Sequence, residues 1–474
     1  MKQFAFKGIP AGLIAVLLCT SCTSLFGPDE RTPMDLPAVY RMDGSGTAAP
    51  NEWWQAFGDG QLDRLVGRAL SGNLSVEQAA ARLRQAEATA IEAGADRFPS
   101  VNGTADAGTT HQHTDSQGTV TTDDYSLGMA ASYELDLWGR VASTRRAALY
   151  ELDSSRFDLE TAAMTIAAET ADTYFQWQYL HQRLAVLEGQ LAVNRKMLSV
   201  IERRFQTSSA SALDVLQQRR YVAAVEANIP PVKASLAAAY NALAILTGVP
   251  PQTDLKLERD SLPGLSPRPE AGLPSDLLTR RPDLQAEWAL LAAADWNVSA
   301  ARASRMPTLT LTGSAAYQDD SVDDLFDNWA RNLAAGLAAP LIDGGRLRAQ
   351  VAMARAAADE QVAAYREAVV TALGEVEDAL SAETRQQEHL EALRRQLDAT
   401  TLAAAEAFRR YTRGLETYYD ALGEETSRQT LEVSVLQAKY ELLSARVQLY
   451  RVLGGDWSDV LERYRTEGGV AEIL

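Results

Sequence analysis

Two hydrophobic patterns divide the chain, and the first is helical. Side chains of a continuous seam recur at alternate steps of four and three residues: Leu180, Leu184, Leu187, Leu191, Asn194, Leu198, Ile201 and Phe205. This heptad spacing is typical of helices that pack side by side as coiled coils. Residues 100–229 and 341–474 contain no proline, so both spans can hold long helices.

We expect four helices, arranged as two antiparallel hairpins. Long helices are predicted over about 140–204 and 346–410. Each is followed by a polar turn and then by a returning helix, over about 213–247 and 418–453. A helix of about 65 residues would be roughly 100 Å long, so it needs packing partners along its length. Pro230-Pro231 predicts a kink in the first returning helix.

The second pattern has a period of two and precedes each long helix. Apolar side chains alternate with small or polar ones over residues 125–137, and again over 308–312 and 333–339. A strand places such an alternating set on one face. With the weaker segment 101–113, these residues predict two hairpins, over about 100–138 and 307–341, whose strands are about long enough to cross an outer membrane. A soluble sheet is the alternative, but the sequence offers no other apolar layer to cover its apolar face.

The sequence is internally duplicated. Gly139-Arg140 recurs as Gly345-Arg346, at an offset of 206 residues. The same offset relates further pairs: Glu169 and Glu375, Leu187 and Leu393, Asp214 and Asp420, and Gly248 and Gly454. We therefore expect two copies of one structural unit, in residues 53–260 and 261–457, and a C-terminal tail in residues 458–474.

The predicted strands and helices both require other copies of the chain. Four strands cannot close a barrel, and an open backbone edge is not tolerated in lipid. The expected fold is therefore mainly α with a membrane β-barrel. Several copies would pool their strands into the β-barrel, and their long antiparallel coiled-coil helices into an α-barrel. The bore of such a tube would be polar, which implies the passage of molecules.

The N-terminus has the features of a secretory signal. Lys2 and Lys7 precede a short apolar run that is interrupted by Pro10 and Gly12 and is too short for a permanent membrane helix. Thr20-Ser21 before Cys22 is similar to a bacterial lipoprotein cleavage box, with Cys22 as the lipidated residue; a plain signal peptide is the alternative. Residues 1–22 are thus assigned to the signal and lipobox, and residues 23–52 to a tether.

Composition excludes several functions. The chain has 45 Lys and Arg against 63 Asp and Glu, a net charge of −18, so nucleic acid is not an expected partner. Both cysteines, Cys19 and Cys22, lie at the N-terminus, and only four histidines occur. No metal or cofactor is therefore expected apart from the covalent lipid on Cys22, and no phosphate loop or nucleophile motif suggests an enzyme.

Short motifs near the ends of the predicted elements complete the picture. They are Trp53-Trp54 with Phe57, Asp59 and Leu62; Arg280, Arg281, Pro282 and Asp283, followed by Ala286-Glu287; and Met306-Pro307, Pro340-Leu341 and Gly344-Gly345-Arg346. Together they resemble motifs of the outer-membrane factor family, the TolC-like export channels, and the resemblance covers nearly the whole mature chain. The motif that begins at Arg280 is similar to a signature of the lipoprotein branch of drug-efflux channels.

This resemblance implies an architecture and a set of partners. The expected assembly is a homotrimer with twelve strands and twelve helices, anchored by lipid in the outer membrane of a Gram-negative bacterium and extending into the periplasm. It would be a passive conduit that catalyses no reaction. The implied partners are a periplasmic adaptor, an inner-membrane pump of the resistance–nodulation–division type, and outer-membrane lipid.

The resemblance also implies a gate at the periplasmic helix tips. Asp214, Tyr411 and Asp420 match its acidic and aromatic positions, and Tyr419 and Glu424 are further candidates. A salt-bridge lock through position 416 is not expected, because Glu416 stands where some members have Arg. The alternative for these acidic residues is a solvated helix face.

A second class of function is kept open by the sequence alone. A periplasmic coiled-coil scaffold or adaptor lipoprotein would also contain long helical hairpins. Such a protein has no use for two strand pairs with an apolar face, so the predicted hairpins favour the channel.

Overall fold

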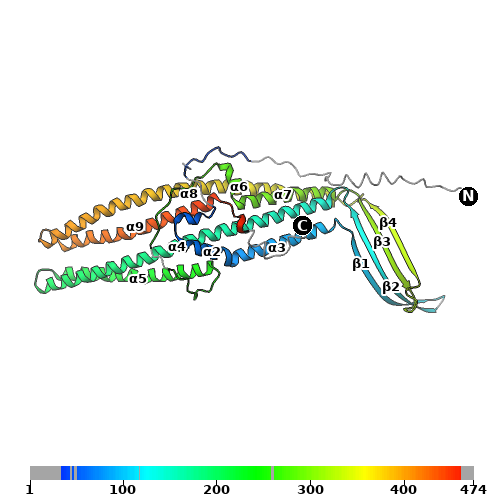
Figure 1. Ribbon diagram of the computed structural model, residues 1–474, viewed down its shortest axis with the longest axis horizontal. Helices are drawn as coiled ribbons and strands as arrows, with labels where there is room; N and C mark the ends of the chain where they lie inside the picture. The colour runs from blue at the N-terminus through cyan, green and yellow to red at the C-terminus, as the bar shows by residue number, and fades with distance from the viewer. Residues whose placement is uncertain (1–33, 43–44, 47–50, 117, 258–260, 461–474) are drawn as a thin grey trace.

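The computed structural model describes residues 34–460 except 43–44, 47–50, 117 and 258–260. The molecule is long and narrow: helices run side by side over most of its length, and a curved sheet projects at one end (Figure 1). The predicted signal, Cys22 and most of the tether and tail lie outside the described residues.

Two long helical hairpins form the body of the molecule. The first consists of α4 and α5 and the second of α8 and α9, and both hairpin tips lie at the end far from the sheet (Figure 1). Their bounds are Arg140–Gln206, Ala212–Leu246, Arg346–Thr412 and Tyr418–Leu453, respectively. The two long helices begin and end 206 residues apart, which is the offset of the sequence duplication. α5 continues through Pro230-Pro231 as one helix.

Glycines in the left-handed region mark the start of both long helices. Gly139 precedes α4 with φ 75°, and Gly345 precedes α8 with φ 88°. Asp136 accepts hydrogen bonds from the first free backbone N–H groups of α4, and Asp343 does so near the start of α8. The chain can therefore turn sharply from strand to helix at both places.

Four antiparallel strands form one sheet in the order β1-β2-β3-β4. Their bounds are Ser100–Thr114, Gly118–Leu135, Thr308–Asp319 and Trp329–Ala338. β2 and β3, which come from different repeats, pair directly, with Leu127 opposite Tyr317. β1 and β4 are the edges of this sheet: among the described strands β1 pairs only with β2, and β4 pairs only with β3, so the outer side of each has no partner. The expected combination of long helices and strand hairpins is confirmed.

Shorter helices that we did not predict complete each repeat. These are α2 (Gly60–Gly72), α3 (Leu74–Ala95), α6 (Leu277–Arg280) and α7 (Pro282–Ala303), with 3-10 turns η1 (Trp53–Phe57) and η2 (Pro274–Asp276). α3 and α7 begin and end 208 residues apart, so they too belong to the duplication. Both pack on α4, and α7 also packs on α8. α3 and α7 lie along the half of the helical body that is nearer the sheet (Figure 1).

An aromatic core joins the N-terminal turn to both repeats. Trp53 of η1 stacks on Tyr450 of α9, with ring centroids 5.2 Å apart, and Phe57 meets Phe175 of α4 edge-to-face at 4.9 Å. Trp53, Phe175 and their neighbour Tyr174 are fully buried. Because this core involves η1, α4 and α9, it holds the two hairpins together in the middle of the rod.

Candidate functional site

The helix tips are the natural place for control of a conduit, because they form the free end of the helical body. The chain turns through residues 207–211 between α4 and α5, and through residues 413–417 between α8 and α9. Ser208 in the first turn and Gly414 in the second have positive φ, of 56° and 75°. Each turn is thus tight, and its returning helix begins within a few residues.

Asp214 and Asp420 occupy the same place in the two tips. Asp214 is the third residue of α5, where its carboxylate accepts from the backbone N–H of Ser211 at 2.8 Å while its own N–H donates to Ser211 Oγ at 3.1 Å. The N–H of Asp420 donates to Thr417 Oγ1 at 3.2 Å, and the Thr417 hydroxyl donates to the Asp420 carboxylate at 2.5 Å. Both carboxylates therefore cap a helix N-terminus, where a negative charge is favourable. This structural role accompanies any role in a gate.

An aromatic pair in the second tip contacts both helices of the first hairpin. Tyr411, at the end of α8, is buried against Tyr418, the first residue of α9, with ring centroids 5.3 Å apart. The Arg204 guanidinium of α4 lies over the Tyr411 ring at 4.7 Å. Tyr418 donates a 2.6 Å hydrogen bond to Gln218 Oε1 of α5. Burial, followed by the nearby Tyr411 and Asp214, raises the pKa of Tyr418, so its hydroxyl stays protonated and can donate.

The predicted gate residues differ in how deeply they are buried. Tyr411 is packed inside the tip, whereas Tyr419 is 64 % exposed and Asp420 is also exposed. Glu424 is half-buried. Asp214 is also half-buried, so every member of this set except Tyr411 keeps some contact with solvent and could line an opening, whereas Tyr411 is placed to support the tip from within.

Two other acidic residues near the tip have partners on their own hairpin. The carboxylate of Glu416, in the turn after α8, lies 3.7 Å from Nε of Arg410 in the last turn of α8. Glu425 pairs with Arg428 at 2.9 Å. Burial alone would raise the pKa of Glu425, but hydrogen bonds from Arg428 and Gln429 outweigh it and lower the pKa. Glu425 is therefore held as a charged, paired carboxylate.

A buried polar layer behind the tips connects the two hairpins. Asn194 Nδ2 of α4 donates to the side-chain oxygen of Gln429 of α9 at 2.9 Å, and Tyr221 of α5 donates to the same oxygen at 3.1 Å. Gln218 donates to the Asn194 carbonyl at 2.9 Å, and Gln190 donates to the Gln429 carbonyl at 3.0 Å. Sequence reasoning missed this layer, although the polar Asn194 in an otherwise apolar heptad seam was a signal for it.

The motif of Arg280, Arg281, Pro282 and Asp283 forms a joint at the other end of the second hairpin. Pro282 is the first residue of α7, where a missing N–H is tolerated. Arg281 is 6 % exposed; its guanidinium donates to Asp283 at 2.7 and 3.0 Å, and to Glu375 of α8 at 2.6 Å. The carbonyl of Arg280 accepts from the backbone N–H of Gly455, just after α9, at 2.8 Å. The motif thus ties α7 to α8 and α9.

Comparisons with known proteins fit this geometry. The sequence profile of the outer membrane efflux protein family matches residues 65–249 and 273–455. The pyoverdine export outer membrane protein OpmQ of Pseudomonas putida is 36 % identical over 422 residues, which are 86 % of this chain and 89 % of OpmQ. The outer membrane protein OprJ of Pseudomonas aeruginosa is 32 % identical over 478 residues, 97 % of this chain and 98 % of OprJ. The solved outer-membrane channel OprN superposes with a TM-score of 0.85 at 30 % identity, covering 91 % of this chain and 99 % of OprN.

The chain belongs to the outer membrane efflux protein family. It is the outer-membrane channel component of an efflux system and not an enzyme, and it extends from the outer membrane into the periplasm. The scaffold or adaptor alternative is thereby set aside, and the resemblance to TolC-like channels is confirmed.

Proposed function

We propose that three copies of the chain close into one continuous tube that conducts small molecules across the periplasm and outer membrane. The observation that carries this proposal is that the described sheet has only four strands, so the outer sides of its edge strands, β1 and β4, have no strand to pair with. Backbone groups at an open edge are too costly in lipid, so β4 of one copy must pair with β1 of the next. Three copies would supply twelve strands, and their hairpins would form the helical barrel below.

The tube serves as the outer part of a three-component pump. A passive channel supplies no energy, so a periplasmic adaptor and an inner-membrane pump must deliver the cargo. We expect the pump to be of the resistance–nodulation–division type, because the motif that begins at Arg280 is similar to that of the drug-efflux branch. The exposed helix tips are the end of the rod that such partners can reach.

The acidic tip residues form the resting constriction. Asp420 and Asp214 stand at matching positions of the two tips, and Tyr419 and Glu424 lie next to them on α9. Copies of one carboxylate gathered around a narrow axis repel one another and attract cations. The resting pore is therefore narrow and selective for cations. Tyr411 acts from within, by supporting the tip.

The lipid on Cys22 anchors the chain in the inner leaflet of the outer membrane. This part of the proposal rests on the sequence Thr20-Ser21-Cys22 after the apolar run of the signal. Intact mass measurement of the mature N-terminal peptide tests it: a diacyl or triacyl mass on Cys22 is expected. An unmodified N-terminus at another residue would contradict it.

Mass measurement combined with planar-bilayer recording tests the tube itself. The purified, detergent-solubilised assembly is expected to have three times the mass of the mature chain and to conduct ions after reconstitution. A stable, water-soluble monomer that conducts no current would contradict the proposal.

A further inference from the structure

The strand register divides the sheet into an apolar and a polar face. Leu127, Tyr317 and Trp329 lie opposite one another across β2, β3 and β4, as do Met129, Ala315 and Arg331. The other face has polar side chains, for example Ser126, Gln318 and Asn332. Because a conducting barrel has a polar lumen and an apolar outer band, the face that contains Trp329 is the lipid-facing one.

The outer end of this face can be identified from the direction of the helices. The helical body extends into the periplasm, so the strand ends next to residues 115–116 and 320–328, far from the helices, lie at the extracellular end of the barrel. Tyr317 and Trp329 stand at the strand ends next to residues 320–328. Aromatic side chains gather at the boundary between hydrocarbon and headgroups, so these residues mark the outer boundary. Arg331 is one lipid-facing position further into the membrane.

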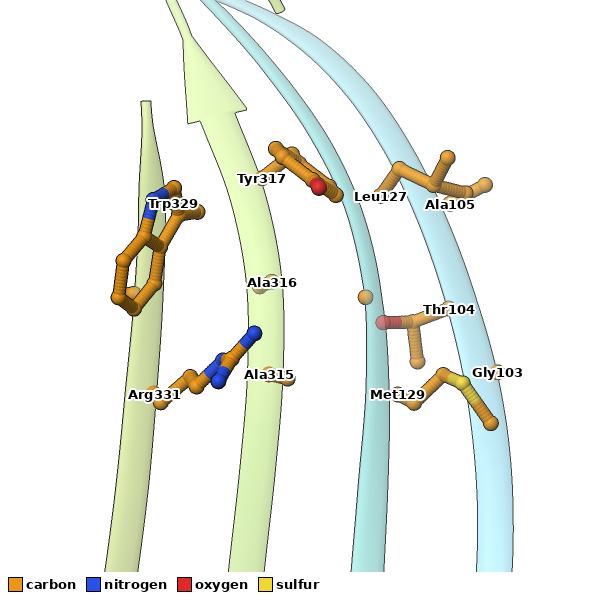
Figure 2. Close-up of a pocket in the computed structure, with 12 residues that line it drawn as sticks. Gly103, Thr104, Ala105, Leu127, Met129, Ala315, Ala316, Tyr317, Trp329 and Arg331 are labelled. Atoms are coloured by element: carbon orange, nitrogen blue, oxygen red, sulfur yellow. The ribbon is translucent and has the colours of Figure 1, made fainter. Parts of the chain in front are cut away.

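A groove runs along this face within one copy of the chain (Figure 2). Ala315 and the backbone of Ala316 in β3 form its floor, Leu127 and Met129 of β2 stand on one side, and Trp329 and Arg331 of β4 stand on the other. Its volume is about 680 Å³. The next copy of the chain pairs along the outer edge of β4, not above β3, so the groove stays open to lipid in the assembled barrel.

Arg331 gives the groove a charge. It is the one charged residue on the lipid-facing side over the paired residues from Leu127 to Tyr133 and their partners in the other strands. Asp319 faces the same side nearer the outer end of β3, where it accepts hydrogen bonds from Asn328 and from the backbone N–H of Ser321. Figure 2 shows its side chain reaching from β4 toward β3, and its guanidinium carbon lies 4.8 Å from the Trp329 ring centroid. No carboxylate among the described residues forms an ion pair with it.

A neighbouring copy offers no carboxylate either. On the lipid-facing side, β1 has small or neutral residues at every second position from Val101 to Thr109, and its acidic Asp106 faces the lumen. An arginine in the outer band of a barrel is destabilising unless it reaches the interface or an anion. The outer leaflet of this membrane consists of phosphorylated glycolipid, and its headgroups begin at the boundary that Tyr317 and Trp329 mark, one lipid-facing position from Arg331.

We propose that this groove is a binding site for the phosphorylated lipid of the outer leaflet. Arg331 pairs with a phosphate of the lipid A headgroup, because a guanidinium matches two phosphate oxygens. An acyl chain lies over Ala315 between the two side walls. The site holds lipid against each copy of the barrel and is independent of the periplasmic gate and the cargo.

Lipid retention by the purified trimer tests this site. Wild type and Arg331→Gln are delipidated in detergent and incubated with diphosphoryl lipid A, and bound lipid per chain is counted by native mass spectrometry. We expect retention by Arg331→Gln to fall about tenfold, as for the loss of one charge-assisted contact. Arg331→Lys should fall less, since it keeps the charge but not the paired geometry. Phosphatidylglycerol is the comparison lipid and should be retained less than lipid A by wild type.

A second variant tests the acyl-chain part of the groove without altering charge. Ala315→Leu fills the floor and should reduce lipid A retention, whereas Ala334→Leu, on the lumen side of β4, should leave it unchanged. Native mass spectra that keep the trimer peak show that each variant has assembled. Equal retention by wild type, Arg331→Gln and Ala315→Leu would overturn the proposal and leave Arg331 as a side chain that merely extends to the headgroup region.

Discussion

A methyl group on Gly454 would lie 2.1 Å from the carbonyl oxygen of Arg280. The same close approach occurs in the first repeat, where a methyl group on Gly248 would lie 1.8 Å from the carbonyl oxygen of Gly72. Gly248 and Gly454 both have positive φ, of 73° and 74°. Each repeat thus uses a glycine at the end of its returning helix to let the backbone of a preceding segment, α2 or α6, pack directly against it.

Gly454→Ala should destabilise the protein. The added methyl group clashes with a backbone atom, and alanine is strained at this φ, so we expect a loss of about 2 kcal/mol or more in the free energy of unfolding. Thermal unfolding followed by circular dichroism measures it. Gly374→Ala is the matched control, because Gly374 lies inside α8 with open space around it; there the substitution should be neutral or stabilising. Equal melting temperatures for the two variants would contradict the prediction.

Arg281→Ala should weaken the joint between α7 and α8. The change leaves the carboxylates of Asp283 and Glu375 without their shared cation, and we expect a loss of about 2–3 kcal/mol, since both carboxylates keep some contact with water. The exposed pair Arg385 and Glu388 provides the control: Arg385→Ala should alter stability by less than about 0.5 kcal/mol. Urea denaturation compares the variants, and a similar small effect for both would show that the motif does not hold the helices together.

Tyr418→Phe and Tyr411→Phe should differ although both remove one hydroxyl near the tip. Tyr418→Phe leaves the buried Gln218 oxygen without its donor, so the free energy of tip opening should fall by about 1–2 kcal/mol. The Tyr411 hydroxyl is buried without a partner among the described residues, so its removal should be neutral or stabilising. Hydrogen–deuterium exchange of backbone amides in residues 411–421 measures tip opening. Faster exchange in Tyr411→Phe than in Tyr418→Phe would contradict this assignment.

Glu160 should make stability depend on pH. Burial, with the nearby charge of Asp456, raises its pKa from 4.5 to about 7. The folded state therefore holds a proton that the unfolded state releases, and stability falls as pH rises from about 4.5 to 7. Glu160→Gln should remove this fall and be more stable than wild type at pH 8, by at most about 3 kcal/mol per chain. Melting temperatures at pH 5 and 8 test this. Glu151→Gln, exposed on the same helix, should keep the wild-type pH dependence; an unchanged dependence in Glu160→Gln would refute the assignment.

Asp420→Asn should reduce the preference of the resting pore for cations. The amide retains an oxygen that can accept the Thr417 hydrogen bond, so the helix cap is preserved while one negative charge per chain is lost. Reversal potentials under a salt gradient in a planar bilayer measure the selectivity. Asp420→Glu keeps the charge and should behave like wild type. If Asp420→Asn has the wild-type reversal potential, Asp420 serves α9 only as a cap.

Local sequence features predicted the long elements well. The heptad seam around Leu187 and the absence of proline located the long helices, and the period of two around Leu127 located a strand. α3 and α7 were missed because their many alanines give no clear seam, although their positions follow the duplication. A kink was predicted at Pro230-Pro231, and the helix continues through both residues.

Contacts between distant segments could not be predicted. The ion pair between Arg281 and Glu375 joins residues 94 positions apart, and the hydrogen bond between Tyr418 and Gln218 joins residues 200 positions apart. The resemblance placed Tyr411 among the gate candidates, but its burial depends on the three-dimensional packing of the tip: Tyr411 packs against Tyr418 of its own hairpin, and Arg204 of the other hairpin lies over its ring. The sequence could therefore place the candidate gate at the helix tips, but it could not distinguish the exposed residues of the tip from the buried ones that support it.

The two open edges of the sheet also govern how the protein reaches its final place. Neither β1 nor β4 can enter lipid alone, so insertion and assembly must occur as a single event. A copy with a damaged edge strand would then disable the intact copies that associate with it. Such a variant, produced together with the normal protein, should make cells sensitive to the compounds that the channel exports, even when most of their chains are normal.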